Sequence, residues 1–177
     1  MNDCIDLLKE VEEGMKSLND IDGVVYSLLY KITAAYYEKK EKFSEFYQAG
    51  LQYLAYTPTS DISPEEQKNW SIKMGMAVVL GKEIYNIAEL LEKDVLKALH
   101  GTDHEWLFHM LQAMETGNIS EFERVCEEHN VYSADPVIEK NKTQLSQKIR
   151  ILAFLDLIFH KEKGERHTTF DEVSVVS

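Results

Sequence analysis

Histidines occur at two places where their spacing is close to that of a metal site. His104 and His109 fit the zinc-binding HExxH motif except for one extra residue between them. Five positions turn a helix by about 140°, so the two rings point apart and cannot share a metal. His100 and His104 are four apart, but Gly101 should end the helix between them. We therefore expect no metal site.

Cys126 and His129 have the spacing of a possible nucleophilic pair on one amphipathic helix. Cys126 falls on the apolar stripe of that helix, and burial raises the pKa of a thiol and makes it inert. The two cysteines, Cys4 and Cys126, form no CxxC motif. This excludes a disulfide scaffold and favours a reducing compartment.

A phosphate-binding loop and an acid/base pair are the remaining chemical candidates. Gly75 and Gly81-Lys82 are separated by five residues instead of four, and Glu83 replaces the Ser/Thr that holds magnesium. The adjacent carboxylates Glu12/Glu13, Glu65/Glu66 and Glu127/Glu128 point apart on a helix, as helix caps or surface charges do. We therefore predict no catalytic residue, no cofactor and no small-molecule substrate.

A group of tyrosines has spacing that could line a groove for a partner. Helical periodicity places most of them in the core or at a hairpin interface instead. The group comprises Tyr26, Tyr30, Tyr36, Tyr37, Tyr47, Tyr53 and Tyr56.

The elements that position these residues must come from 177 residues, enough for one medium domain or two small ones. Apolar residues make up 44% and charged residues 28%, as in ordinary globular proteins. The formal net charge of -12 would repel nucleic acid. No apolar run approaches the roughly 20 residues that span a bilayer, and no secretory signal pattern is present. We expect neither a nucleic acid nor a membrane partner.

Apolar side chains recur at helical spacing along most of the chain. Val24, Leu28 and Ile32 mark one helix, and a stripe over 43–54 marks the next. The short link at 38–42 predicts that these two form an antiparallel hairpin. Residues 57–63 are the clearest loop.

Capping signals predict where the later helices begin. Ser63-Pro64 should open a helix that runs to about Leu80, and Asn118 should open another. Thr102, with Glu105 three residues later, predicts the start of a third helix. Residues 87–99 predict one helix, bent near Asp94. Asp135-Pro136 should open one long final helix to about Lys163.

The last part of the chain has two unusual features. Residues 149–159 are apolar nearly all round, which predicts a helix buried between layers. A capping box at 169–172 then opens a helix only about two turns before Ser177, too short to be stable alone. We interpret this as a cut inside a further domain. Phe170, Val173 and Val176, with part of 149–159, should then lack their natural cover and form a candidate interface.

Together these patterns predict an all-α protein of about eight helices. The expected architecture is an irregular helical-repeat (α-solenoid-like) stack of antiparallel helix hairpins. Because no chemical site is found, the chain is expected to act as an interaction scaffold.

Several segments resemble the helical part of PCI-family subunits of the 26S proteasome regulatory particle. They include YKITAAYYEKK at 30–40, FSEFYQAGLQYL at 43–54 and LGKEIYNIAELL at 80–91. Further similar segments lie at 99–107, 117–122, 148–152 and 168–173. Each is short, but their order and spacing are specific, and the resemblance covers roughly residues 20–176.

The resemblance implies a domain division and a function. Residues 1–165 would be the helical-repeat region, and 166–177 the truncated beginning of the winged-helix part. The chain would be a non-catalytic subunit of the lid in ubiquitin-dependent protein degradation, in cytoplasm and nucleus. Its partners would be other lid subunits, including the deubiquitinating subunit and PCI neighbours.

Two alternatives stay open. The chain could be a PCI scaffold of another assembly, such as the COP9 signalosome or a translation initiation complex. It could also be a free-standing helical regulator that captures a peptide in an aromatic groove.

Overall fold

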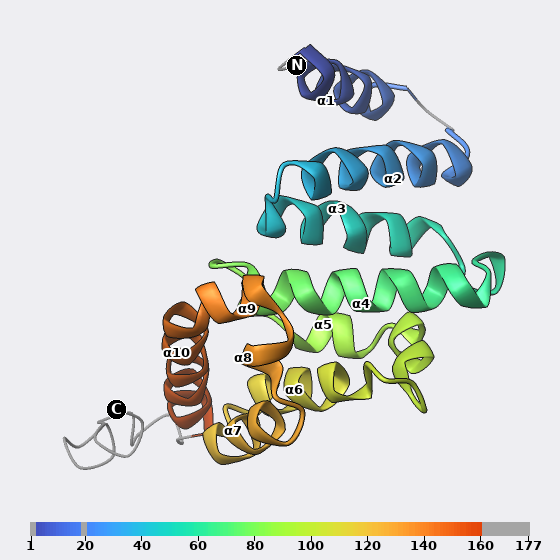
Figure 1. Cartoon of the computed structure of the whole chain (residues 1–177). Coiled ribbons are helices and arrows are strands. Elements are labelled where there is room, and N and C mark those ends of the chain that lie inside the picture. Colours follow the sequence, from blue (N-terminus) through green and yellow to red (C-terminus); the bar gives the residue numbers. More distant parts are fainter. Residues whose placement is uncertain (1–2, 19–20, 161–177) are drawn as a thin grey trace. The chain divides into compact units, whose positions relative to one another are not determined.

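The computed structural model describes residues 3–18 and 21–160 (Figure 1). All regular elements in these ranges are helices and none is a strand, which confirms the all-α prediction. The chain divides into two compact units. The first contains the residues up to Gly81 together with Lys93–Ala98, and the second contains Lys82–Glu92 and the residues from Leu99 onward.

The first unit is a stack of helices, each packed on the next (Figure 1). The helices are α1 (Asp3–Lys16), α2 (Gly23–Lys39), α3 (Phe43–Tyr56) and α4 (Pro64–Leu80), with a short 3₁₀ turn η1 (Thr59–Asp61) before α4. The predicted antiparallel hairpin is α2 and α3. Its link turns at Glu41, whose φ is +53°. The chain also turns back because the amide of Lys42 donates to the carbonyl of Tyr37 (3.0 Å).

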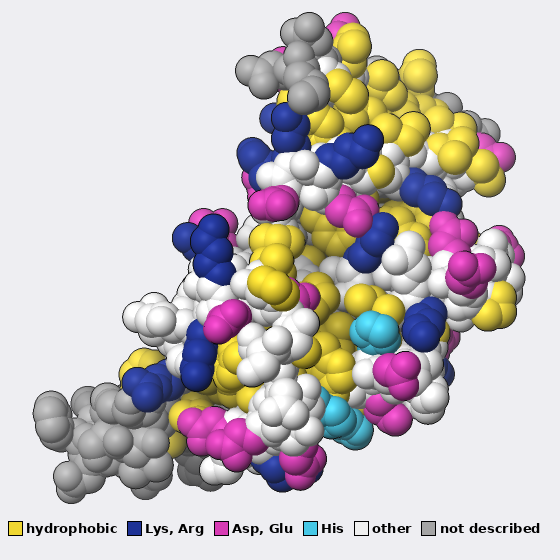
Figure 2. Space-filling model, in the orientation of Figure 1, with side chains coloured by type: hydrophobic (Ala, Val, Ile, Leu, Met, Phe, Trp, Pro, Cys, Tyr) yellow, Lys and Arg dark blue, Asp and Glu magenta, His cyan; other side chains and the backbone are white. Residues whose placement is uncertain are grey.

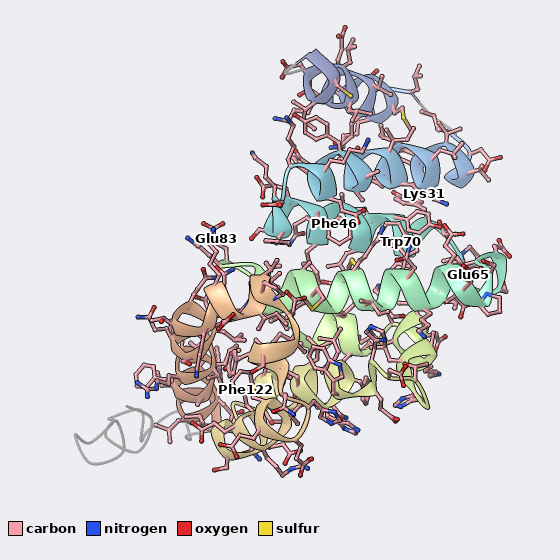
Figure 3. The ribbon with its side chains drawn as sticks, viewed as in Figure 1. Lys31, Phe46, Glu65, Trp70, Glu83 and Phe122 are labelled. Carbon is pink, nitrogen blue, oxygen red and sulfur yellow. The ribbon has the colours of Figure 1, made fainter. Side chains whose placement is uncertain are left out.

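The core of the first unit lies between α3 and α4. Phe46 and Tyr53 on α3 stack on Trp70 of α4, with ring centroids 5.9 and 4.6 Å apart (Figure 3). Gly50 allows this close approach, because a Cβ on it would lie 2.3 Å from the sulfur of Met74. The helix α4 begins as predicted, since the Ser63 hydroxyl accepts from the amide of Glu66 (3.3 Å).

The prediction of a single bent helix over 87–99 is wrong. The structure has one turn of α-helix, α5 (Ala88–Leu91), and then a 3₁₀ helix, η2 (Asp94–Leu99). The apolar side chains keep their spacing and are buried, so periodicity did not reveal the break. A tertiary bond holds η2, because Ser71 of α4 places its hydroxyl 2.5 Å from the carbonyl of Val95.

The second unit packs α10 (Lys142–His160) against α6 (Glu105–Glu115) and α7 (Ile119–Glu128). Two short helices, α8 (Val131–Ala134) and α9 (Pro136–Lys140), connect α7 to α10. The start of α7 is as predicted, because Asn118 accepts from the amide of Glu121 (3.0 Å).

Two predicted helix boundaries in this unit are wrong. The long final helix is broken at Asn141, whose side-chain amide donates to the carbonyl of Val137 (2.8 Å). Thr102 does not cap α6, which begins three residues later at Glu105. The Thr102 hydroxyl accepts from His104 in a preceding turn, and the Glu105 carboxylate accepts from the amide of Gly101 (3.1 Å).

Candidate protein-binding surface

The histidines of the metal candidate do not converge. His100 lies 3.1 Å from the carboxylate of Glu105, and this contact and the Gly101 amide lower the pKa of Glu105. His104 precedes α6 and His109 is exposed on it. Among residues 3–18 and 21–160, no three His, Cys, Asp or Glu side chains are grouped as a metal site would need.

The candidate thiol and phosphate loop have structural roles. Cys126 is buried, and this burial raises the pKa of its thiol, while His129 is exposed at the end of α7. Gly75 is inside α4 and Gly81 ends it, so they form no loop around an anion. These placements match the predicted structural roles of these residues.

The paired carboxylates separate into surface and tertiary contacts. Glu12 accepts from the hydroxyl of Tyr30 on α2 (3.1 Å) and pairs with Lys16 (2.7 Å). The pair with Lys16, the stronger cause, lowers the pKa of Glu12. Glu66 pairs with Lys31 across 2.6 Å and so links α4 to α2. Glu12 and Glu66 therefore hold helices together.

The tyrosines lie mainly at helix interfaces, as the periodicity predicts. Tyr47 and Tyr53 are buried, and Tyr26 and Tyr30 of α2 stack on Tyr56 of α3 at 4.9 and 5.9 Å. Burial, then the bond to Glu12, raises the pKa of Tyr30 to about 12.

The first helix carries an apolar face that no described residue covers. Ile5, Leu8 and Met15 are partly or fully buried on one side of α1, and Leu7 and Val11 are exposed on another. Leu7 is 59% exposed. Cys4, Leu7 and Val11 recur at helical spacing and form a second stripe, and Leu18 is exposed just past the end of α1.

A second exposed stripe lies on α2. Val24, Leu28 and Ile32 repeat every four residues and are each more than half exposed. Figure 2 shows apolar surface gathered over α1 and α2. We call the exposed apolar side chains of these helices, together with Leu18 just past the end of α1, the N-terminal apolar face. It comprises Leu7, Val11, Leu18, Val24, Val25, Leu28 and Ile32.

This face is suited to protein contact. Burying one such side chain is worth about 1.5–3 kcal/mol, so exposing several in water is unfavourable. Larger exposed apolar patches usually mark interaction sites. Exposed Asp6, Glu10 and Glu13 outnumber the exposed Lys9 and Lys16 on the same helix, which favours a partner with cations beside its apolar side chains.

Sequence reasoning missed α1 and its two faces. The spacing of Cys4, Leu7 and Val11 was the available signal. For α2 the stripe predicted the helix, but its spacing did not indicate that the side chains are exposed. Periodicity shows that residues share a face, and it does not show what covers that face.

The other candidate interface is only partly visible. Phe170, Val173 and Val176 lie outside the described residues. The prediction that 149–159 is buried is only partly right, because Ile149 and Leu152 are buried while Phe159 is 73% exposed. Exposed apolar side chains therefore also occur toward the end of α10. No helix in the described part of the chain is both long and apolar enough to cross a membrane.

Comparisons with a family model and with individual proteins indicate the same family. Residues 1–111 match the family model described as PSD13 N-terminal repeats. The chain is 34% identical over 165 residues to 26S proteasome non-ATPase regulatory subunit 13 homolog A of Arabidopsis thaliana, covering 93% of this chain and 43% of that protein.

Relatives outside plants have corresponding names. The chain is 33% identical to 26S proteasome non-ATPase regulatory subunit 13 of Dictyostelium discoideum, over 98% of this chain and 46% of the relative. It is 29% identical to the probable 26S proteasome regulatory subunit rpn9 of Schizosaccharomyces pombe, over 98% and 45%. The chain thus spans less than half the length of the curated relatives it matches.

Proposed function

The chain belongs to the family of PSD13 N-terminal repeats, and from this premise we propose that it is a non-catalytic structural subunit of the 26S proteasome regulatory particle. It would act as an interaction scaffold of the lid in ubiquitin-dependent protein degradation. Its place of action would be the cytoplasm and the nucleus.

One observation carries this proposal. Relatives named as regulatory subunits of the 26S proteasome align with 93% to 98% of the chain. Almost all of the helices described above therefore lie in the part shared with those subunits. The resemblance in sequence and the match to the family point to the same assembly.

The proposed mechanism is geometric. In the first unit, α2, α3 and α4 are joined by a buried aromatic core and by the Lys31–Glu66 ion pair. Such a packed stack holds its outer helices at fixed positions. The N-terminal apolar face would dock on another subunit of the particle, which covers the apolar side chains and places cations beside Asp6 and Glu10. Candidate partners are the deubiquitinating subunit and the PCI neighbours.

Co-purification tests the proposal directly. The tagged 177-residue chain is expressed in its native cells, and the proteins that purify with it are quantified by mass spectrometry. We expect regulatory-particle subunits to be enriched. A double variant, Leu28→Glu with Ile32→Glu, should lose most of this enrichment, because it places two charges in the N-terminal apolar face.

A matched control separates docking from folding. Val137→Gln changes an exposed apolar side chain on α9, outside the N-terminal apolar face, and should leave the enrichment unchanged. Both proteins should melt close to the temperature of the wild-type chain. Enrichment of signalosome or initiation-complex subunits, or a monomer without proteasome partners, would refute the assignment. An intact interaction in the double variant would refute only the proposed surface.

A further inference from the structure

A pocket of the second unit has a charge opposite to that of the chain as a whole. It has a volume of about 510 Å³ and lies between the loop after α4 and the start of α10. The loop contributes Lys82 and Tyr85, α9 contributes Lys140, and α10 contributes Lys148. This volume falls in the range of ligand-binding pockets, about 300–1,000 Å³.

The lining is basic although acids outnumber bases in the sequence by 31 to 19. None of the described residues that line the pocket is Asp or Glu. Glu83, beside Lys82, extends outward from the loop and is not part of the lining (Figure 3). Asn141 and Gln144 add side-chain amides to the wall. A local field of this sign attracts anions.

Lys148 distinguishes this pocket from a chance group of surface lysines. Its side chain is 2% exposed, and its amine lies 5.8 Å from the ring centroid of Tyr85. Burial lowers the pKa of Lys148 to about 8. An anion bound in the pocket would favour the charged form of this amine.

Among anions, the chemistry favours a carboxylate on a peptide. Lysine amines are compact point charges that bind a carboxylate in many orientations. Side-chain amides at the wall can bond to a peptide backbone. A nucleic acid would need a row of cations along its phosphates, and it would meet the repulsion of the acidic chain around a single pocket.

We propose that this lysine-lined pocket binds a glutamate or aspartate side chain of an acidic peptide segment in a partner protein, with Lys148 at its base. Lys82 and Lys140 flank the entrance and Tyr85 forms one wall. The site is separate from the N-terminal apolar face, since it lies in the other unit. It requires only a partner with an acidic segment, whichever assembly contains the chain.

Fluorescence anisotropy with a labelled peptide tests the proposal. The probe is a six-residue peptide of alternating glutamate and glycine, acetylated and amidated, titrated with the 177-residue chain at pH 7 and low salt. We expect saturable binding. The double variant Lys82→Gln with Lys140→Gln should weaken it about tenfold, since each exposed charge pair is worth up to about 1 kcal/mol.

The control variant changes the net charge by the same amount at other positions. Lys9→Gln with Lys39→Gln removes two exposed lysines outside the pocket. Lys39 matches Lys140 in its position, because each lies in the last turn of its helix. It should bind the peptide within twofold of wild type. Equal weakening in both variants would show attraction by overall charge alone and would overturn the proposal.

Alternative ligands give distinct outcomes. A peptide with glutamine in place of glutamate should not bind, and neither should a peptide of lysine and glycine. If a phosphoserine peptide or inorganic phosphate binds while the glutamate peptide does not, the pocket binds phosphate and the proposal is wrong. Carbodiimide coupling offers a second readout, because it should join the peptide to Lys82 or Lys140 in preference to Lys9 and Lys39.

Discussion

Gly117 lies so close to Ala153 that a methyl group on the glycine would sit 2.4 Å from the α-carbon of Ala153. The obstacle is backbone of α10, which cannot rotate away as a side chain can. Gly117 also has a φ of +59°, a conformation that favours glycine. The turn between α6 and α7 therefore packs on α10 only because this residue has no side chain.

We expect Gly117→Ala to destabilise the protein by about 3 kcal/mol. The positive φ contributes about 1 kcal/mol and the contact with α10 about 2 kcal/mol. Gly101→Ala is the control, because Gly101 has a φ of +70° with no atom within 4 Å of the added methyl. Gly101→Ala should lower the free energy of unfolding only by the contribution of the positive φ, about 1 kcal/mol. Chemical denaturation measures both, and equal losses would show that the contact contributes nothing.

Lys148→Met should change how stability depends on pH. The folded pKa of Lys148 is about 8, below the value of 10.5 expected when the chain is unfolded. Between these values the unfolded chain binds more protons, so the free energy of unfolding rises with pH, by up to roughly 3 kcal/mol. Lys148→Met has no such group, so this rise in the free energy of unfolding should be absent from the variant.

The comparison must isolate Lys148 from its neighbours in the pocket. Lys82, Lys140 and Tyr85 are the other titratable residues of the lining and are unchanged in both proteins. The difference in the free energy of unfolding between wild type and variant, measured from pH 7 to 10, therefore reports Lys148. Parallel curves would contradict a lowered pKa for this residue.

Ser71→Ala should destabilise the first unit by about 1–2 kcal/mol. The buried Ser71 hydroxyl lies 2.6 Å from the carbonyl of Gln67 and 2.5 Å from that of Val95. Its one proton bonds to one of them at a time, and the contact with Val95 joins α4 to η2. Removing the hydroxyl takes this buried hydrogen bond away. Ser120→Ala, at an exposed position, should change stability by less than about 0.5 kcal/mol in the same denaturant titration.

The two thiols should differ greatly in reactivity. Cys4 is exposed, whereas Cys126 is buried and its thiol has a raised pKa because of that burial. In native protein near pH 8, a thiol reagent should modify Cys4 quickly and Cys126 only on unfolding. Cys4→Ser should abolish the fast phase. A fast phase that remains in Cys4→Ser would show that Cys126 is accessible.

Several helix boundaries could be predicted because their signals are local. The hydroxyl of Ser63 and the side-chain oxygen of Asn118 accept from backbone amides three residues away, and Gly117 supplies a turn of positive φ. The candidate surface was not predicted, because exposure of the stripe on α2 depends on which helices pack against it.

The sequence by itself determined that this chain folds into consecutive helices and where several of them begin, since helix caps and turns act over four residues or fewer. Only the tertiary structure decided that 87–99 divides into α5 and η2, that Lys148 is buried beside Tyr85, and that Leu28 and Ile32 face outward. These outcomes depend on contacts between residues far apart in the chain. A periodic pattern selects a face of a helix, and packing alone selects what that face meets.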